Sequence, residues 1–234
     1  RIIDGKIEPV IVGFPKDSYG TGPSYDIGPL GLLFLDEHTL VVGGGGLPDG
    51  EDAVRVYKIG DRGDELIDAS DTSGKSFSLA KDGQTPGEGN FYALAKGATG
   101  VFVTCNGDDE QGWVAKATVG GNLDLIKFQR SIATKKATGV DAPVGITISP
   151  QGYVTVGQMG EINDETDSLL TFYSEAGVLL GKYKTGLHDI TGLAYGPKHG
   201  RLFALDFHWA NTKEGGLYKL VDAKNDTKCN AVLM

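Results

Sequence analysis

The residues best suited to chemistry in this sequence are carboxylates, amides and histidines in short polar loops between apolar segments. Carboxylate and amide oxygens hold metal ions or bind polar ligands, and an imidazole adds a proton donor, a proton acceptor or a metal ligand. No His-x-Glu or His-x-x-x-His spacing of a zinc motif occurs. The candidate ligand-binding residues are Asn106, Asp141, Glu161, His188, Asp189, Asp206, His208 and Trp209.

Three of these residues, Asn106, Glu161 and Asp206, form a candidate metal set, because each offers a side-chain oxygen just after an apolar strand. Ca²⁺ or Zn²⁺ is the cation that such a set would take, and no cofactor is certain. The alternative is that Asp, Asn and Gly satisfy the backbone of their own turns, as they do in most loops. His188 and His208 are ligands, a general base or solvated loop residues. The sequence names no catalytic residue.

The elements that position these loops form an internal repeat. Four segments share one plan, which is a short apolar strand, a turn of three to five residues and a second apolar strand. Turn residues between β-branched and aromatic runs are typical of a β-hairpin. Small residues in the first strand let its backbone pack closely against equivalent strands. The matched positions, spaced 62, 52 and 47 residues apart, are Gly31, Ala93, Gly145 and Gly192.

A third strand follows each hairpin, and a fourth, more weakly patterned strand follows the third. Units of this size and content predict an all-β fold, a β-propeller of four-stranded blades. No segment carries a sustained helical period, so helices should be scarce. We expect residues 1–234 to form a single domain, with a partial blade at 1–20 and blades at about 28–70, 90–130, 142–186 and 189–234.

The two ends of the chain lack a matching inner hairpin. Residues 1–3 and 8–13 are interpreted as an outer strand pair, and the chain stops at another outer strand, 231–234. Propellers usually close when C-terminal strands complete the N-terminal blade. We therefore expect residues to be absent from one or both ends, and five or six blades in the intact protein.

The phase of the repeat places the candidate residues together. In a propeller, the loops after the second strand and those entering the first strand emerge on one face around the axis. All eight candidates lie in such loops. The sequence therefore predicts a polar pocket at one mouth of the axis, for a metal ion or a small polar ligand.

Composition narrows the choice of partner and compartment. The chain has 36 glycines, a formal net charge of −9 and a pI of about 4.9. A negative surface repels phosphate, so nucleic acid is excluded as a partner, and no apolar run is long enough to be a transmembrane segment. Cys105 and Cys229 are interpreted as buried thiols, with a disulfide as the alternative. A periplasmic or secreted, extracytoplasmic location is favoured.

Two repeats resemble known blades. The segment from Ala142 to Val156 (APVGITISPQGYVTV) resembles the NHL repeat, and the segment from Ile190 to Asp206 (ITGLAYGPKHGRLFALD) looks like blades of SMP-30/gluconolactonase-like propellers. In lactonases of that superfamily, Glu, Asn and Asp from different blades hold a divalent metal at the axis. Asp206 matches the family aspartate, whereas Val144 and Thr191 stand at the asparagine positions.

These observations favour a binding or interaction module, which recognises a protein or a small polar ligand on its acidic loop face. The alternative is a metal-dependent lactonase-like hydrolase or lyase with its site at the propeller axis. Whether the chain is an enzyme stays open at this point, because propellers host many unrelated functions.

Overall fold

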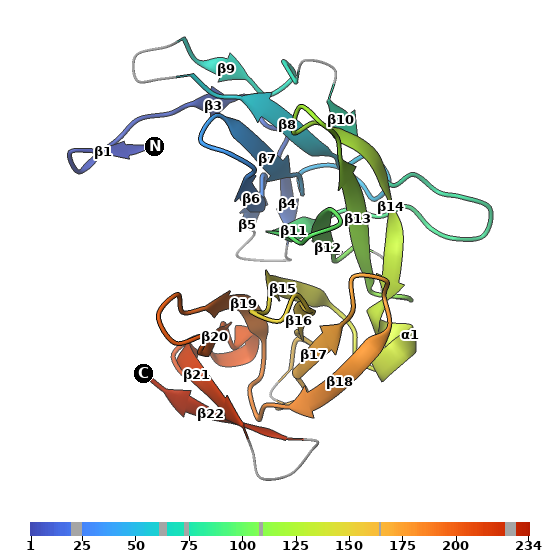
Figure 1. The fold of residues 1–234 in the computed structure, drawn as a ribbon, viewed down its shortest axis with the longest axis vertical. Helices are drawn as coiled ribbons and strands as arrows, with labels where there is room; N and C mark the ends of the chain where they lie inside the picture. The colour runs from blue at the N-terminus through green and yellow to red at the C-terminus, as the bar shows by residue number, and fades with distance from the viewer. Residues whose placement is uncertain (20–24, 61–64, 73–74, 108–109, 164, 223–227) are drawn as a thin grey trace.

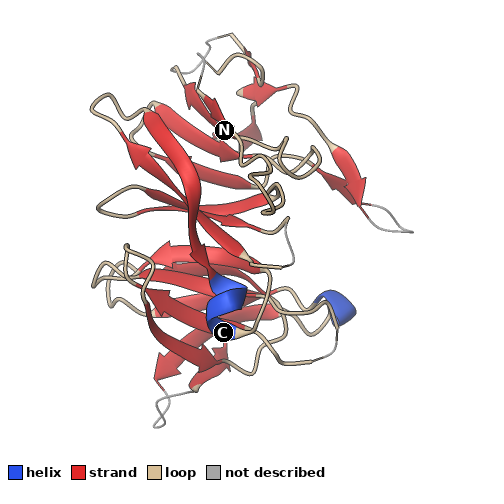
Figure 2. Cartoon of the chain, turned by 90° about the vertical axis from the view of Figure 1, so that its right-hand side faces the viewer, coloured by secondary structure: helices blue, strands red, loops and turns tan. Residues whose placement is uncertain are grey.

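The computed structural model describes residues 1–19, 25–60, 65–72, 75–107, 110–163, 165–222 and 228–234 (Figure 1). Strands dominate these residues, and the helices are short (Figure 2). The helices are α1 (Thr134–Thr138) and the 3₁₀ helix η1 (Trp209–Asn211). The prediction of an all-β chain with scarce helices is confirmed. None of the helices among the described residues has the length and apolar character needed to span a membrane.

Four antiparallel sheets of four strands form the blades of a β-propeller, and each blade begins with its innermost strand. Blade 1 contains β6 (Gly31–Phe34), β7 (Thr39–Gly43), β8 (Val54–Lys58) and β10 (Ser76–Phe77). Blade 2 contains β11 (Phe91–Lys96), β12 (Val101–Cys105), β13 (Trp113–Val119) and β14 (Leu125–Ala133).

The second half of the chain repeats this order. Blade 3 contains β15 (Pro143–Ile148), β16 (Val154–Gln158), β17 (Leu169–Tyr173) and β18 (Leu179–Lys184). Blade 4 contains β19 (Ile190–Tyr195), β20 (Leu202–Asp206), β21 (Gly216–Asp222) and β22 (Cys229–Leu233). The outer strand of blade 1 lies beyond residue 70, where we expected that blade to end. The total of five or six blades stays a prediction.

The innermost strands lie next to one another around one axis, with β6 against β11, β11 against β15 and β15 against β19 (Figure 1). The four matched positions of the repeat all fall on these strands, as predicted. The core lies between blades, because each sheet buries its faces against its neighbours. Val41 packs with Phe91 between blades 1 and 2, Phe102 with Val156 between blades 2 and 3, and Leu170 with Ile190 between blades 3 and 4.

Glycines allow this close packing. A Cβ atom on Gly43 would overlap the carbonyl oxygen of Phe91 in the neighbouring blade. A Cβ atom on Gly145 would lie 3.3 Å from the Cα atom of Gly192, which is closer than most real contacts of this kind. Blades 1 and 2, and blades 3 and 4, therefore approach each other at positions where only glycine fits without a backbone shift.

The N-terminal segments do not pair as the sequence analysis expected. β1 (Ile2–Ile3) pairs with β2 (Lys6–Ile7), and of the segment 8–13 only Glu8 joins this pairing, through hydrogen bonds with Arg1. The reason is the Asp4-Gly5 turn, in which both residues have positive φ, of 50° and 75°. Asp-Gly favours a two-residue hairpin turn, and this local pairing leaves residues 9–13 for another partner.

The segment released in this way covers blade 1. β3 (Ile11–Val12) pairs in parallel with β9 (Ile67–Asp68), while β4 (Asp17–Tyr19) and β5 (Tyr25–Ile27) form a hairpin. Ile11, Phe14 and Ile67 pack against the buried Val42 and Tyr57 of blade 1. These strands therefore shield an apolar face of blade 1 that would otherwise contact water.

Because the blades approach so closely, the stability of the fold should be sensitive to a larger residue at Gly43. We expect Gly43→Ala to lower the free energy of unfolding by about 1–3 kcal/mol, because the backbone of Phe91 must move to admit a methyl group. Gly121→Ala is the matched control, since a Cβ atom there has no neighbour within 4 Å, and its effect should stay within about 0.5 kcal/mol. Urea unfolding followed by circular dichroism measures both. Equal stability of the two variants would contradict the packing described.

Candidate functional site

Five of the eight predicted site residues meet at the loop face of blade 4. His188 and Asp189 immediately precede the innermost strand β19, and Asp206 ends the second strand β20. His208 and Trp209 follow in the next loop, where η1 begins. The register of the blade, which pairs Ile190 with Asp206, brings the two loops side by side.

Asp206 holds the loop that enters the innermost strand. Its Oδ2 atom accepts the backbone N–H of His188 at 3.1 Å, and its Oδ1 atom accepts the backbone N–H of Asp189 at 2.8 Å. The carboxylate is 2% exposed. Buried N–H groups at the start of a strand need acceptors, so this carboxylate has a structural role.

Asp189 is also fully buried and carries a second set of bonds. Its Oδ2 atom accepts the backbone N–H of Trp209 at 2.6 Å, and its carbonyl oxygen accepts that of Phe207 at 2.9 Å. Its Oδ1 atom has no hydrogen-bond partner among the described residues. Burial raises the pKa of the Asp189 carboxyl. The hydrogen bond from the Trp209 N–H opposes this shift, Asp206 adds to it, and the two imidazoles oppose it.

The two histidines form a stacked pair. The ring centroids of His188 and His208 lie 3.6 Å apart, and the ring planes differ by 5°. His208 is buried and has a φ of 50°, a left-handed conformation that is uncommon outside glycine. The Nδ1 atom of His188 lies 3.7 Å from the Oδ2 atom of Asp206, and the His188 side chain is 23% exposed. His188 is therefore the member of this pair that a ligand can reach.

A serine that the sequence analysis missed joins this site to blade 3. The Oγ atom of Ser168 accepts the backbone N–H of Ile190 at 3.1 Å and lies 2.6 Å from the carbonyl oxygen of His188. Ser168 is fully buried at the start of the third strand of blade 3. Ser168 lies next to a third strand, whereas the sequence analysis considered only the loops after second strands and before first strands. The phase of the repeat therefore did not identify it.

An aromatic patch, defined as Tyr25, Phe207 and Trp209, lies beside His188. The ring centroids of Phe207 and Trp209 are 4.4 Å apart, and those of Tyr25 and Trp209 are 6.3 Å apart. Tyr25 is 55% exposed and Phe207 40% exposed. Because Tyr25 belongs to β5, this patch also joins the N-terminal hairpin to blade 4.

Apolar side chains occupy the loop-face end of the innermost strands. Trp209 and Tyr92 pack against Ala142, Val144 and Met159, so the cluster joins residues of blades 2, 3 and 4. The hydroxyl of Thr104 donates to the carbonyl of Val144 at 2.8 Å and links blades 2 and 3 at the same level. An apolar cluster therefore lies at the mouth where we expected a polar pocket, and the pocket stays a prediction.

The remaining predicted residues make separate contacts. Asp141 forms an ion pair with Lys135 of α1 at 2.6 Å, a partner that the sequence analysis did not identify. Asn106 exchanges hydrogen bonds with Asn90, and Glu161 is exposed, with its backbone N–H 3.2 Å from the carboxylate of Asp167.

The candidate metal set of Asn106, Glu161 and Asp206 stays a prediction. The described residues contain no group of three or more His, Cys, Asp or Glu side chains arranged to hold a metal ion. Cys105, which is buried, and Cys229, which is half-buried, are not joined by a disulfide.

Buried carboxylates also accept hydrogen bonds from backbone N–H groups just before two other innermost strands. Asp52 accepts the backbone N–H of Leu47 and that of Asn90, both at 3.0 Å, and burial raises the pKa of its carboxyl. Asp141 accepts the backbone N–H of Ala142 at 2.7 Å. These carboxylates and Asp206 support the interpretation that loop carboxylates satisfy backbone groups.

The comparisons with known proteins add a similarity of fold. No family model matches the chain, and no curated protein matches it. A solved structure of luciferin-regenerating enzyme is similar over 86% of this chain and 78% of that one, with a TM-score of 0.47 and 13% sequence identity. The resemblance to NHL and SMP-30-like propellers stays a prediction.

Because the carboxyl of Asp189 is buried, we expect the stability of an asparagine variant, relative to the wild type, to depend on pH. The folded state raises the pKa of Asp189, so its contribution to stability is full below the unfolded pKa of about 4 and is lost as pH rises. Asparagine keeps an acceptor for Trp209 and does not ionise. We expect the stability of Asp189→Asn relative to the wild type to increase between about pH 4 and pH 7.

Urea unfolding at several pH values measures this difference. Glu161→Gln, at an exposed carboxylate, is the control and should show no comparable trend. A relative stability of Asp189→Asn that falls as pH rises would contradict the description of this site.

Proposed function

We propose that this propeller is a binding module and that its loop face holds a basic, extended segment of a partner protein. The aromatic patch supports this proposal. Phe207 is partly exposed, and its backbone and that of Trp209 are held by hydrogen bonds to the buried Asp189. Tyr25 is exposed, and its ring contacts Trp209. Exposed aromatic rings on a rigid base are frequent binding anchors, because they lose little conformational entropy on contact.

The charge of the chain supports a basic partner. The formal net charge is −9, and Glu161, Glu165 and Glu214 are exposed in loops of the same face. Lysine and arginine side chains stack on aromatic rings and pair with carboxylates, and a negative field raises the association rate of a positive segment. His188 adds a hydrogen-bonding group beside the rings.

A fluorescence titration tests this function. Trp209 lies within the patch and reports on binding, whereas Trp113 lies in blade 2. The probe is a peptide of alternating Lys and Ser, and the control peptide alternates Glu and Ser. We expect the basic peptide alone to change the emission, with affinity that falls as salt is added.

Matched variants locate the contact. Phe207→Ser should weaken binding of the basic peptide about five- to thirtyfold, which corresponds to about 1–2 kcal/mol for an interface anchor. Phe34→Ser removes another exposed phenylalanine, on β6 and outside the patch, and should leave the affinity unchanged. Equal effects of the two substitutions, or equal binding of the two peptides, would refute the proposed function.

One observation favours a second function, a metal-dependent hydrolase or lyase of the lactonase-like type. Asp189 carries a buried oxygen without a partner among the described residues, close to Asp206 and to the stacked imidazoles. A cation would offset the repulsion between the two carboxylates. Under this alternative, calorimetric titration with Ca²⁺ or Zn²⁺ gives stoichiometric heat that His188→Gln reduces. Absence of heat with both metals would remove this alternative and leave the binding module.

A further inference from the structure

A cavity of about 710 Å³ lies between blades 3 and 4, on the side opposite the loop face. It opens near Tyr153, which follows the first turn of blade 3, and near Arg201, which follows the first turn of blade 4. The loops of the aromatic patch leave the opposite ends of these strands. This inter-blade groove is therefore separate from the site proposed above, and its volume lies within the range of small-molecule sites.

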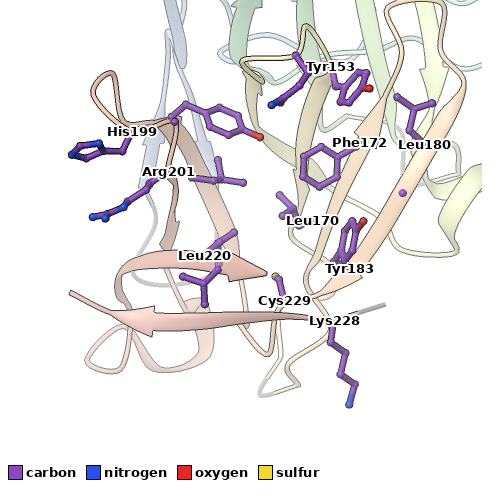
Figure 3. Close-up of a pocket in the computed structure, with 16 residues that line it drawn as sticks. Tyr153, Leu170, Phe172, Leu180, Tyr183, His199, Arg201, Leu220, Lys228 and Cys229 are labelled. Atoms are coloured by element: carbon purple, nitrogen blue, oxygen red, sulfur yellow. The ribbon is translucent and has the colours of Figure 1, made fainter. Parts of the chain in front are cut away.

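Apolar and aromatic side chains form the body of the groove (Figure 3). Leu170, Leu202 and Leu220 are buried beneath it and belong to the core between the two blades. Phe172 and Tyr183 stand edge to face, with ring centroids 5.7 Å apart and planes at 87°. Such a wall accepts a flat apolar body, which gains area burial and ring contacts.

Among the described residues, the charged side chains that line the groove are of one sign. The chain has 31 acidic and 22 basic residues, yet no Asp or Glu lines the groove among the described residues. The basic side chains that line it are His199, Arg201 and Lys228. Figure 3 shows His199 and Arg201 at one end and Lys228 at another, with their tips outside the apolar wall. An anionic group at the rim would meet these cations.

A half-buried thiol also lines the groove. Cys229 begins β22 beside Lys228, and its Sγ atom lies 3.9 Å from the carbonyl oxygen of Lys184. The other cysteine, Cys105, is fully buried in blade 2. Alkylation of Cys229 therefore reports on whether the groove is filled.

We propose that the inter-blade groove binds a small organic anion with a flat apolar body, such as an aromatic carboxylate. The body lies against Phe172 and Tyr183, and the carboxylate lies in the positive field of Arg201 and Lys228, which stand at different ends of the rim. Apolar burial supplies most of the affinity, and the rim cations select the sign of the charge.

Protection of Cys229 tests the proposal. The probes are naphthoate, naphthalenemethanol and naphthylmethylammonium, which share one ring system and differ in charge. Each is titrated against alkylation of the folded protein by iodoacetamide, a neutral reagent, and the modified peptides are identified by mass spectrometry. We expect naphthoate to protect Cys229 at concentrations about fivefold lower than the alcohol, and the ammonium compound to protect least. Cys105 should stay unmodified throughout.

Variants of the rim distinguish charge selection from apolar adsorption. Arg201→Gln and Lys228→Gln should each weaken protection by naphthoate about threefold and leave the alcohol unaffected. Lys198→Gln, in the same turn as Arg201 but outside the lining, is the matched control. Equal protection by all three probes would overturn the selection of an anion, and no protection by any probe would overturn the site itself. Neither result bears on the basic-peptide site, because that site lies on the other face.

Discussion

The closeness of the innermost strands is the constraint on which the rest of this structure depends. At Gly43 the chain has no room for a Cβ atom against Phe91, and at Gly145 it faces the backbone of Gly192. Neighbouring blades can then bury their apolar faces against each other, which supplies the core. The same close packing buries the residues just before the innermost strands. The backbone N–H groups of these residues therefore need hydrogen-bond acceptors within the protein.

Buried carboxylates provide those acceptors, and this requirement limits what the loop face can do. Asp52, Asp141 and Asp206 each accept backbone N–H groups at the entry to an innermost strand. A carboxylate committed in this way is less available to a metal ion. The groups left for recognition are His188 and the exposed rings of Tyr25 and Phe207, which lie beside the packed side chain of Trp209. This division favours binding over catalysis at the loop face.

The sequence predicts the blades well, because the repeat is a direct consequence of strand alternation and turn chemistry. The phase of the repeat also places His188, Asp189, Asp206 and His208 together, since it fixes which strand ends share a face. The repeat says less about Glu161, because position within a long loop is set by local contacts, such as the bond from its backbone N–H to Asp167, that the repeat does not encode. Those contacts depend on the particular turn conformations.

Two further features could not be predicted from the repeat, for physical reasons. The Asp4-Gly5 hairpin is a local preference that outweighs the longer-range pairing expected for the N-terminal segment. The inter-blade groove arises from the packing of two sheets, with Phe172 from one blade and Leu220 from the next, so no single repeat contains it. The basic side chains that line it, Arg201 and Lys228, come from different strands and meet only in the assembled blades.

The central claim is that the loop face of blade 4 is a recognition surface. Hydrogen exchange of the protein with and without the basic peptide tests this claim most directly. The method reports local opening of hydrogen-bonded segments, which a bound ligand suppresses. The account predicts slower exchange across residues 188–190 and 206–212, with unchanged exchange across 197–203, on the opposite side of the blade. Unchanged exchange across 206–212, or slower exchange confined to 197–203, would contradict it.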